Sequence, residues 1–155
     1  MSAPTETMLV GVDGSDGGKA ALEFAAGEAA FRGARLRIVS VWEVSAAAFG
    51  GGLAPLDPAV WDAFRGVAQQ VADDALASVK KLQPSLEAEA VVVQGQPADA
   101  LLEQGADAVL IVVGRRGLGG FRSLLLGSVS QQVVQHATCQ VVVVNQPAAD
   151  VSQGP

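Results

Sequence analysis

Apolar runs typical of buried strands alternate along this chain with longer stretches of helical periodicity. The β-rich runs are Met8–Val12, Leu36–Trp42, Ala88–Val93, Ala108–Val113 and Val141–Val144. Because these runs are almost continuously apolar, we expect both faces of each strand to be covered. Strands that alternate with helices in this way form parallel sheets. The pattern predicts one α/β domain: a Rossmann-like, doubly wound sheet of five parallel strands with helices on both faces.

Four stretches between the strands have a helical period. Apolar residues share one face of the first, second and fourth stretches: Ala20, Phe24, Gly27 and Phe31; Val60, Phe64, Val67, Val71, Val79 and Leu82; Leu125, Val129, Val133 and His136. The third stretch is short, from Pro97 at the first helical position to Gln104, and Gly105 is its stop signal. In the first stretch, Lys19 and Glu23 have the i,i+4 spacing of an ion pair.

Two regions do not follow this alternation. The segment Ser45–Pro58 contains Gly50-Gly-Gly and two prolines, and it is too long for a routine connection. It is interpreted either as a flap over a binding site or as an insertion without a role. Residues 1–147 are predicted to form the domain, and residues 148–155 are predicted to be a flexible tail.

Composition excludes several classes of partner. The formal net charge is -6 and the pI is about 4.6 over 155 residues, which argues against duplex DNA or an anionic membrane. No apolar run reaches the roughly 18 residues that a membrane span needs. The polar start shows no signal-peptide pattern. A single cysteine, Cys139, suits a reducing compartment, so we expect a cytoplasmic protein.

A glycine-rich segment follows the fourth apolar run. It reads Gly114-Arg-Arg-Gly117, and after nine further residues comes Gly127-Ser128 at the start of an amphipathic stretch. Glycines let backbone N–H groups approach an anion closely, and a helix N-terminus adds its own N–H groups and partial positive charge. Arginines at positions 115, 116 and 122 make this part of an acidic chain locally basic. The segment predicts a phosphate-binding site.

Three segments are expected at the same edge of the sheet, since ligands of open α/β sheets bind outside the carboxyl ends of the strands. They are residues 12–15 after the first strand, Val41-Trp42 at the end of the second, and residues 114–120 after the fourth.

Other phosphate and catalytic motifs are absent. The sequence Gly18-Lys19 lacks the first glycine and the Ser/Thr of a P-loop, because Asp13 and Ala20 occupy those positions. The dinucleotide fingerprint G-x-G-x-x-G also fails after the first strand. His136 is the only histidine, so a Ser-His-Asp or Cys-His arrangement is not indicated. His136 and Cys139 have the spacing of two zinc ligands, but the chain has no other Cys or His to complete a zinc site. We therefore assign no catalytic and no metal-binding residue.

The spacing G-x2-G-x9-G-S resembles the nucleotide-binding signature of the universal stress protein family, in its ATP-binding branch. The resemblance covers nearly the whole chain: Met8-Leu-Val-Gly-Val-Asp-Gly-Ser15 is similar to the opening strand and loop, and Gly127-Ser-Val-Ser and His136-Ala-Thr-Cys-Gln-Val-Val-Val-Val144 are similar to the last helix and strand. One departure is Gln140, where the family usually has proline.

The resemblance implies a strand order of 3-2-1-4-5 and a set of contacts with an adenine nucleotide. It places Asp13 against the nucleoside and the main chain of Val41 at the adenine edge. Ribose and phosphates are expected at Gly114, Arg116, Gly117, Gly127, Ser128, Val129 and Ser130. The strand ends Gly11, Val12 and Val113 complete the predicted set. The implied cofactor is ATP, with or without magnesium.

Two roles are open for Asp13, and one backbone conformation is expected for Gly127. A carboxylate beside phosphates would repel them, so Asp13 is predicted to contact a base, a sugar or a cation; alternatively, Asp13 or Ser15 caps the first helix. Gly127 is expected to adopt a positive φ.

Three classes of function remain: a regulatory protein of the stress response that acts through its nucleotide-bound state, a slow ATPase or phosphotransferase, and a scaffold without nucleotide affinity. We favour the first, with no enzyme activity beyond weak hydrolysis, because no convincing general base or metal-binding carboxylate pair is found. cAMP competes with ATP as the ligand. Since Val141–Val144 would be an edge strand, the resemblance also implies a homodimer through that edge.

Overall fold

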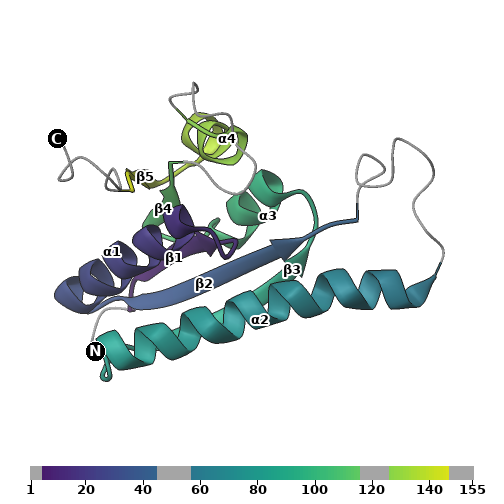
Figure 1. Cartoon of the computed structure of the whole chain (residues 1–155). Helices are drawn as coiled ribbons and strands as arrows, with labels where there is room; N and C mark the ends of the chain where they lie inside the picture. Colours follow the sequence, from purple (N-terminus) through teal and green to yellow (C-terminus); the bar gives the residue numbers. More distant parts are fainter. Residues whose placement is uncertain (1–4, 45–56, 116–125, 147–155) are drawn as a thin grey trace, which may run out of the picture.

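The structure is a computed structural model in which residues 5–44, 57–115 and 126–146 are described. Strands and helices alternate along the chain as predicted (Figure 1). In order they are β1 (Thr7–Val12), α1 (Asp16–Arg32), β2 (Arg35–Trp42), α2 (Pro58–Leu82), β3 (Ala88–Gln94), α3 (Pro97–Gln104), β4 (Leu110–Gly114), α4 (Ser128–His136) and β5 (Gln140–Val144).

The five strands form one parallel sheet in the order β3-β2-β1-β4-β5, so the predicted order and direction are confirmed. β1 lies in the middle, and β3 and β5 lie at the edges. The fourth strand begins at Leu110, two residues later than the apolar run suggested. Gln140 is the first residue of β5 and pairs with Leu110, so the position noted as a departure from the family pattern belongs to the ladder.

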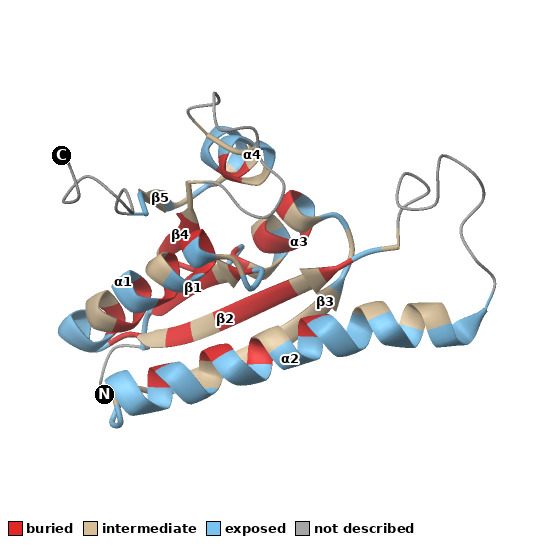
Figure 2. Ribbon diagram, in the orientation of Figure 1, coloured by how far each residue is buried: buried red, intermediate tan, exposed pale blue. Residues whose placement is uncertain are grey.

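Helices cover both faces of the sheet. Alternate residues of β1 point to opposite sides: Val10 packs with α1 and α2, and Leu9 packs with α3 and α4. Figure 1 shows the two helix pairs on opposite sides of the sheet, and Figure 2 shows the buried residues concentrated along the strands and the sheet-facing sides of the helices. The continuous apolar runs of the sequence therefore reflect strands that are buried on both faces.

The buried face of α1 differs from the predicted one. Phe31 is 87% exposed and Phe24 is 40% exposed. The helix instead buries small residues, including Ala21, Ala25 and Ala29, because a helix that lies close to a sheet leaves no room for larger rings. The predicted pair of Lys19 and Glu23 does not form; the ion pair of this helix joins Arg32 to Glu28 at 2.7 Å.

In α2 the predicted face is also only partly correct. Pro58 is at the first helical position and Asp57 caps the helix by accepting from the amide of Ala59 at 2.9 Å. Three of the four buried residues of this helix are alanines: Ala68, Ala72 and Ala75 are buried together with Val79. Val67 is 67% exposed, although the periodicity placed it on the packed face.

The two tryptophans pack against each other where β2 ends. Trp42 and Trp61 make an edge-to-face contact with ring centroids 6.2 Å apart, and the Arg65 guanidinium lies 5.5 Å from the Trp42 ring centre. Two residues before Trp42, the buried hydroxyl of Ser40 donates to the carbonyl of Ala68 at 2.9 Å. These contacts attach the N-terminal half of α2 to the carboxyl end of β2.

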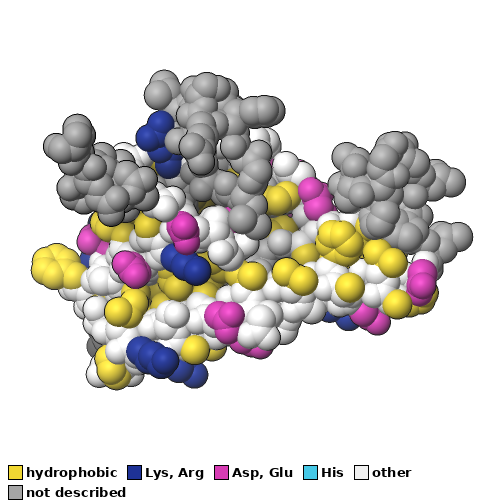
Figure 3. All heavy atoms as spheres, viewed as in Figure 1, with side chains coloured by type: hydrophobic (Ala, Val, Ile, Leu, Met, Phe, Trp, Pro, Cys, Tyr) yellow, Lys and Arg dark blue, Asp and Glu magenta, His cyan; other side chains and the backbone are white. Residues whose placement is uncertain are grey.

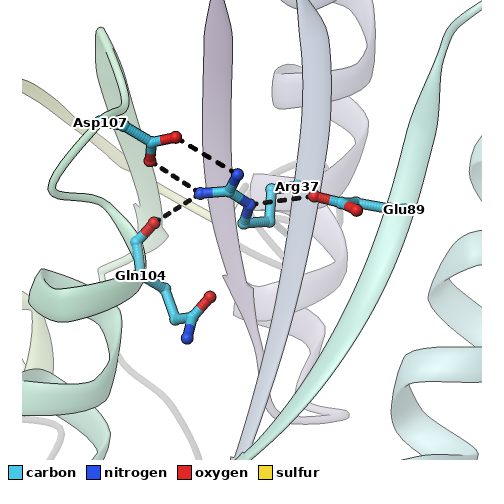
Figure 4. A network of polar contacts seen from close by, with 4 residues as sticks. All are labelled: Arg37, Glu89, Gln104 and Asp107. Atoms are coloured by element: carbon cyan, nitrogen blue, oxygen red, sulfur yellow. Dashed lines mark hydrogen bonds and ion pairs between the residues drawn. The ribbon is translucent and has the colours of Figure 1, made fainter.

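Arg37 links α3 to the sheet near the amino ends of the strands (Figure 4). Its guanidinium donates to Asp107 at 2.8 Å, to the carbonyl of Gln104 at 2.7 Å and to Glu89 at 3.0 Å. The hydrogen bonds to Asp107 and Glu89 raise the pKa of Arg37, and the bond from Arg37 holds the pKa of Asp107 below its usual value. The interaction satisfies a carbonyl at the C-terminus of α3 and joins it to β2 and β3.

Helix α3 has the predicted limits, with Pro97 in its first turn and Gly105 as its C-cap. His136 ends α4 and is exposed. Most of the Ser45–Pro58 segment, residue Leu125 and the tail lie outside the described residues, so the interpretations placed on them stay predictions. None of the helices in the described ranges could cross a membrane.

Candidate functional site

The predicted strand-end residues meet at one point of the sheet. The ladder between β1 and β4 has its last pair at Val10 and Val112, whereas both strands continue further. The residues beyond that pair are Gly11 and Val12 on β1 and Val113 and Gly114 on β4. The strand order reverses between β1 and β4: β2 and β3 lie on one side of β1, and β4 and β5 lie on the other. This is the switch point where doubly wound sheets bind ligands.

Asp13 and Ser15 organise the loop that follows β1. Oδ1 of Asp13 accepts from the amide of Ser15 at 3.0 Å and from its hydroxyl. The Ser15 hydroxyl oxygen accepts from the amide of Gly18 at 3.1 Å and thereby caps α1. Gly14, between them, has φ of +84°, a left-handed conformation that favours glycine. Ser15 is therefore the cap of α1, and the exposed carboxylate of Asp13 supports that cap.

Gly114 brings the first turn of α1 against the end of β4. A Cβ atom at Gly114 would lie only 2.7 Å from the carbonyl oxygen of Gly17. Backbone cannot yield as a flexible side chain can, so the contact requires glycine at position 114. Glycine at this position was predicted for a close approach to phosphate; in the structure its neighbour is the backbone of Gly17. The start of α1 and the end of β4 are thus packed together at the switch point.

Helix α4 begins at the same edge of the sheet without a side-chain cap. Gly127 is its N-cap and has no side chain that could accept from the first amides of the helix. The first turn of α4 contains no acidic residue, whereas that of α1 contains Asp16. The expected positive φ of Gly127 is wrong: its φ is -73° and its ψ is 168°, an extended conformation open to any residue. The lack of a side chain is what distinguishes this cap.

Two hydrogen bonds hold the start of α4 to the end of β4. The amide of Gly127 donates to the carbonyl of Arg115 at 2.8 Å, and the hydroxyl of Ser130 donates to the same carbonyl at 2.9 Å. The amide of Arg115 donates in turn to the carbonyl of Val144 at 3.0 Å. Ser130 is buried, whereas Ser128 is exposed in the same turn. The two predicted phosphate-binding serines therefore have different surroundings.

The remaining predicted residues fall into two groups. Val41 lies on β2 just past the last pair of that strand with β1, which joins Val12 to Ser40. Val41 and Val129 are half-buried and pack with the apolar cluster beneath α3 and α4. Arg116 and Gly117 lie outside the described residues. Gly17 was missed by the sequence analysis, although two consecutive glycines at the start of a helix, Gly17 and Gly18, were a visible signal.

A separate hollow of about 280 Å³ lies between α1 and α2. Its buried lining residues include Val12, Leu22 and Ala75, and Lys19, Glu23 and Asp74 lie around it. It adjoins the loop after β1 through Gly14 but includes none of the residues predicted to hold phosphates.

Charged side chains of the described residues are mixed rather than segregated. Figure 3 shows Lys and Arg side chains interspersed with Asp and Glu over α1 and α2 on the face in view, without a continuous basic area among the coloured atoms. Within the described ranges no three His, Cys, Asp or Glu residues are grouped as metal ligands would be. Cys139 is half-buried, and its burial raises the pKa of the thiol.

Comparison with known proteins gives a consistent result. The model of the family described as "Universal stress protein family" matches residues 4–145. A universal stress protein of Thermus aquaticus is 38% identical over 141 residues, which cover 90% of this chain and 98% of the relative. One from Mycolicibacterium smegmatis is 37% identical over 138 residues, covering 88% of this chain but 45% of the relative, so the chain spans about half the length of that protein.

A solved structure agrees with the fold. A universal stress protein in complex with cAMP is 27% identical, covers 93% of this chain and 99% of its own, and superimposes with a TM-score of 0.67. The five-stranded parallel sheet with this order and these helices is thus shared with known proteins of the family.

Proposed function

The chain belongs to the universal stress protein family, and on that premise we propose that it binds an adenine nucleotide and acts in the stress response through its bound state. The proposed ligand is ATP, one per chain, held at the switch point between β1 and β4. The family assignment supports nucleotide binding in general, and a relative of the same fold was solved with cAMP. The choice of ATP comes from the sequence signature around Gly114 and Gly127.

The observation that carries the proposal is the uncapped start of α4 at the switch point. The N-cap of α4, Gly127, offers no side-chain acceptor to the first amides of the helix, and the helix N-terminus has a partial positive charge. A phosphate group supplies the oxygen acceptors that such amides lack. Because Gly127 has no side chain, nothing of its own occupies the position that the phosphate would take.

The nucleoside is assigned to the neighbouring strand ends. The Asp13 carboxylate is exposed in the loop after β1, and Val41 lies past the last pair between β1 and β2. Carboxylate and main-chain groups can bond base or ribose donors, which phosphates do not offer. This arrangement favours adenosine at β1 and β2 and phosphates at α4, with preference for adenine over guanine.

Identification of the ligand is the direct test. The purified protein is denatured, and the released small molecules are separated by chromatography and identified by mass. We expect an adenine nucleotide in a ratio near 1:1 to the chain. Calorimetric titration with ATP, ADP, AMP, cAMP and GTP then ranks the ligands. Absence of saturation by every one of them at millimolar concentration would leave a scaffold that has lost nucleotide affinity.

cAMP is the second candidate ligand, since the solved relative named above holds it. A phosphate bound at α4 defines one anion position but not the number of phosphates. Tighter binding of cAMP than of ATP in the same titration would replace ATP by cAMP in the proposal.

Hydrolysis is proposed to be slow or absent. Two carboxylates lie at this edge of the sheet: Asp13, which accepts hydrogen bonds from Ser15, and Asp16 in the first turn of α1. Phosphoryl transfer needs a positioned metal ion and a group that orients the nucleophile. Release of phosphate from ATP with and without magnesium measures the rate; turnover above about one per minute, fast on the scale of a binding protein, would make the enzyme alternative the better description.

We also propose a homodimer that forms through β5. This strand is at the edge of the sheet, and its valines are half-buried between the two apolar clusters. Antiparallel pairing of two such edges would satisfy the outer N–H and C=O groups. Sedimentation equilibrium of wild type, Val142→Lys and Val143→Pro tests it. A dimer that persists in both variants must use another surface.

A further inference from the structure

We propose that Ser130 is a positioning residue, which sets the start of α4 for anion binding through the Arg115 carbonyl and does not touch the ligand. This inference rests on the proposed function and assigns a different role from the phosphate contact expected from the sequence signature. It concerns how the binding amides are held in the protein before any ligand arrives.

The first argument is burial. Ser130 is 2% exposed, so its hydroxyl lies inside the protein rather than at the surface where a phosphate would bind. Ser128, two residues earlier in the same turn, is exposed. Because successive residues of a helix point in different directions, the two hydroxyls cannot share one role.

The second argument is how the Ser130 hydroxyl is bonded. It has one proton, which is within reach of the Arg115 carbonyl at 2.9 Å and of the Gly127 carbonyl at 3.1 Å. The Arg115 carbonyl also accepts from the Gly127 amide at 2.8 Å. Both bonds to Arg115 join the first turn of α4 to the residue that follows β4, so the hydroxyl reinforces the same junction as the Gly127 amide.

The third argument is what the backbone of Arg115 is attached to. Its N–H group donates to the carbonyl of Val144, the last residue of β5, at 3.0 Å. The N–H group of Arg115 is therefore fixed by the sheet, and its carbonyl group is fixed by α4. A helix N-terminus binds an anion well only when its amides are already placed, since ordering them on binding would oppose affinity. Ser130 contributes to that placement.

The test compares Ser130→Ala with Ser128→Ala, a matched change in the same turn. Hydrogen exchange is measured first on the ligand-free protein, at the amides of Gly127 and, as an internal reference, Ala137 at the far end of α4, which bonds to Val133. We expect Ser130→Ala to speed exchange at Gly127 about tenfold and to leave Ala137 unchanged. Ser128→Ala is expected to change neither amide.

Affinity is then measured by calorimetry with ATP and with adenosine. Ser130→Ala is expected to weaken ATP about tenfold and adenosine less than twofold, since only the phosphate half of the site is misplaced. Ser130→Cys keeps a side chain of similar size with a weaker donor and should lie between wild type and alanine. It also serves as the second variant if the alanine variant does not fold.

Two results would overturn the inference. If Ser130→Ala and Ser130→Cys lose ATP affinity while the Gly127 amide exchanges as in wild type, Ser130 acts on the ligand directly. If neither exchange nor affinity changes, the hydroxyl has no positioning role. Failure of the wild type to bind any nucleotide would instead remove the proposed function, and the exchange experiment would still decide whether Ser130 holds the junction.

Discussion

The helices α1 and α4 both begin at the carboxyl edge of the sheet, but their N-termini are capped differently. At α1 the Ser15 hydroxyl accepts from the Gly18 amide, Asp13 supports Ser15, and Asp16 adds a negative charge to the first turn. At α4 the cap is Gly127, which has no side-chain acceptor, and the first turn contains no acidic residue. The cap residue of α1 accepts from its own helix, whereas that of α4 cannot, and we propose that a phosphate is the acceptor there. This contrast separates a structural helix start from one that suits an anion.

The largest expected effect comes from giving α4 the cap that α1 already has. Gly127→Asp places a carboxylate at the N-cap, where it bonds the first amides and repels phosphate. We expect ATP affinity to fall about 100-fold, the scale of losing charge-assisted hydrogen bonds, while the melting temperature stays the same or rises. The φ of -73° at Gly127 is compatible with aspartate.

Calorimetry and thermal melts measure both quantities on the same sample. Gly127→Asn is the control, because it supplies a similar cap without the charge and should cost less affinity. Wild-type ATP binding by Gly127→Asp would contradict the contrast between the two termini, since a self-capped α4 would then serve as well as an uncapped one.

The next effect concerns Asp13, whose carboxylate supports the α1 cap and is proposed to contact the nucleoside. Asp13→Ala is expected to weaken adenosine and ATP by similar factors of about ten, comparable to one hydrogen bond to a charged group. The fold should persist with a lower melting temperature. A loss confined to ATP would place Asp13 near the phosphates, and unchanged affinity with reduced stability would leave it the capping role alone.

Ser15→Ala tests the same comparison at the N-terminus of α1. It removes the α1 cap and should lower the free energy of unfolding by about 1 kcal/mol, the usual cost of losing a serine cap. Because α1 is predicted to be structural at this end, ATP affinity should change less than threefold. Urea titration and calorimetry are the measurements. A tenfold loss of ATP affinity would show that the α1 terminus also takes part in binding.

The smallest effect is expected far from both termini, at the Arg37–Asp107 pair. The pKa of Asp107 is lowered in the folded protein, so the pair stabilises the fold above the unfolded pKa of about 4, and this contribution disappears as the pH falls through the lower folded value. Asp107 is largely exposed, so the contribution is roughly 0.5 kcal/mol after solvent screening.

Urea unfolding of wild type and Asp107→Asn at pH 7 and at pH 3 tests this. The difference in stability should be present at pH 7 and should shrink in acid, and ATP affinity should be the same in both proteins at pH 7. A difference that grows in acid would have the wrong sign for a lowered carboxyl pKa.

Much of the fold was determined by the sequence alone. Runs such as Ala108–Val113 are apolar on both faces, which is typical of a parallel strand covered on both sides, and Pro97 and Gly105 marked the limits of α3 because their backbone chemistry acts locally. The meeting of the predicted strand ends followed too, since the carboxyl ends of parallel strands share one edge. The glycine pattern then indicated which strand ends to examine.

Tertiary structure decided what depends on distance between elements. The periodicity of α1 could not tell that the alanine face is buried and Phe31 exposed, because the choice rests on how closely the helix approaches the sheet. The partners of Arg37 are 52 to 70 positions away in sequence, and Ser130 bonds a carbonyl 15 positions earlier. Local preferences fix conformation within a few residues, whereas these contacts exist only once strands and helices are packed, which is why the bond from Ser130 to Arg115 became visible in the structure and not in the sequence.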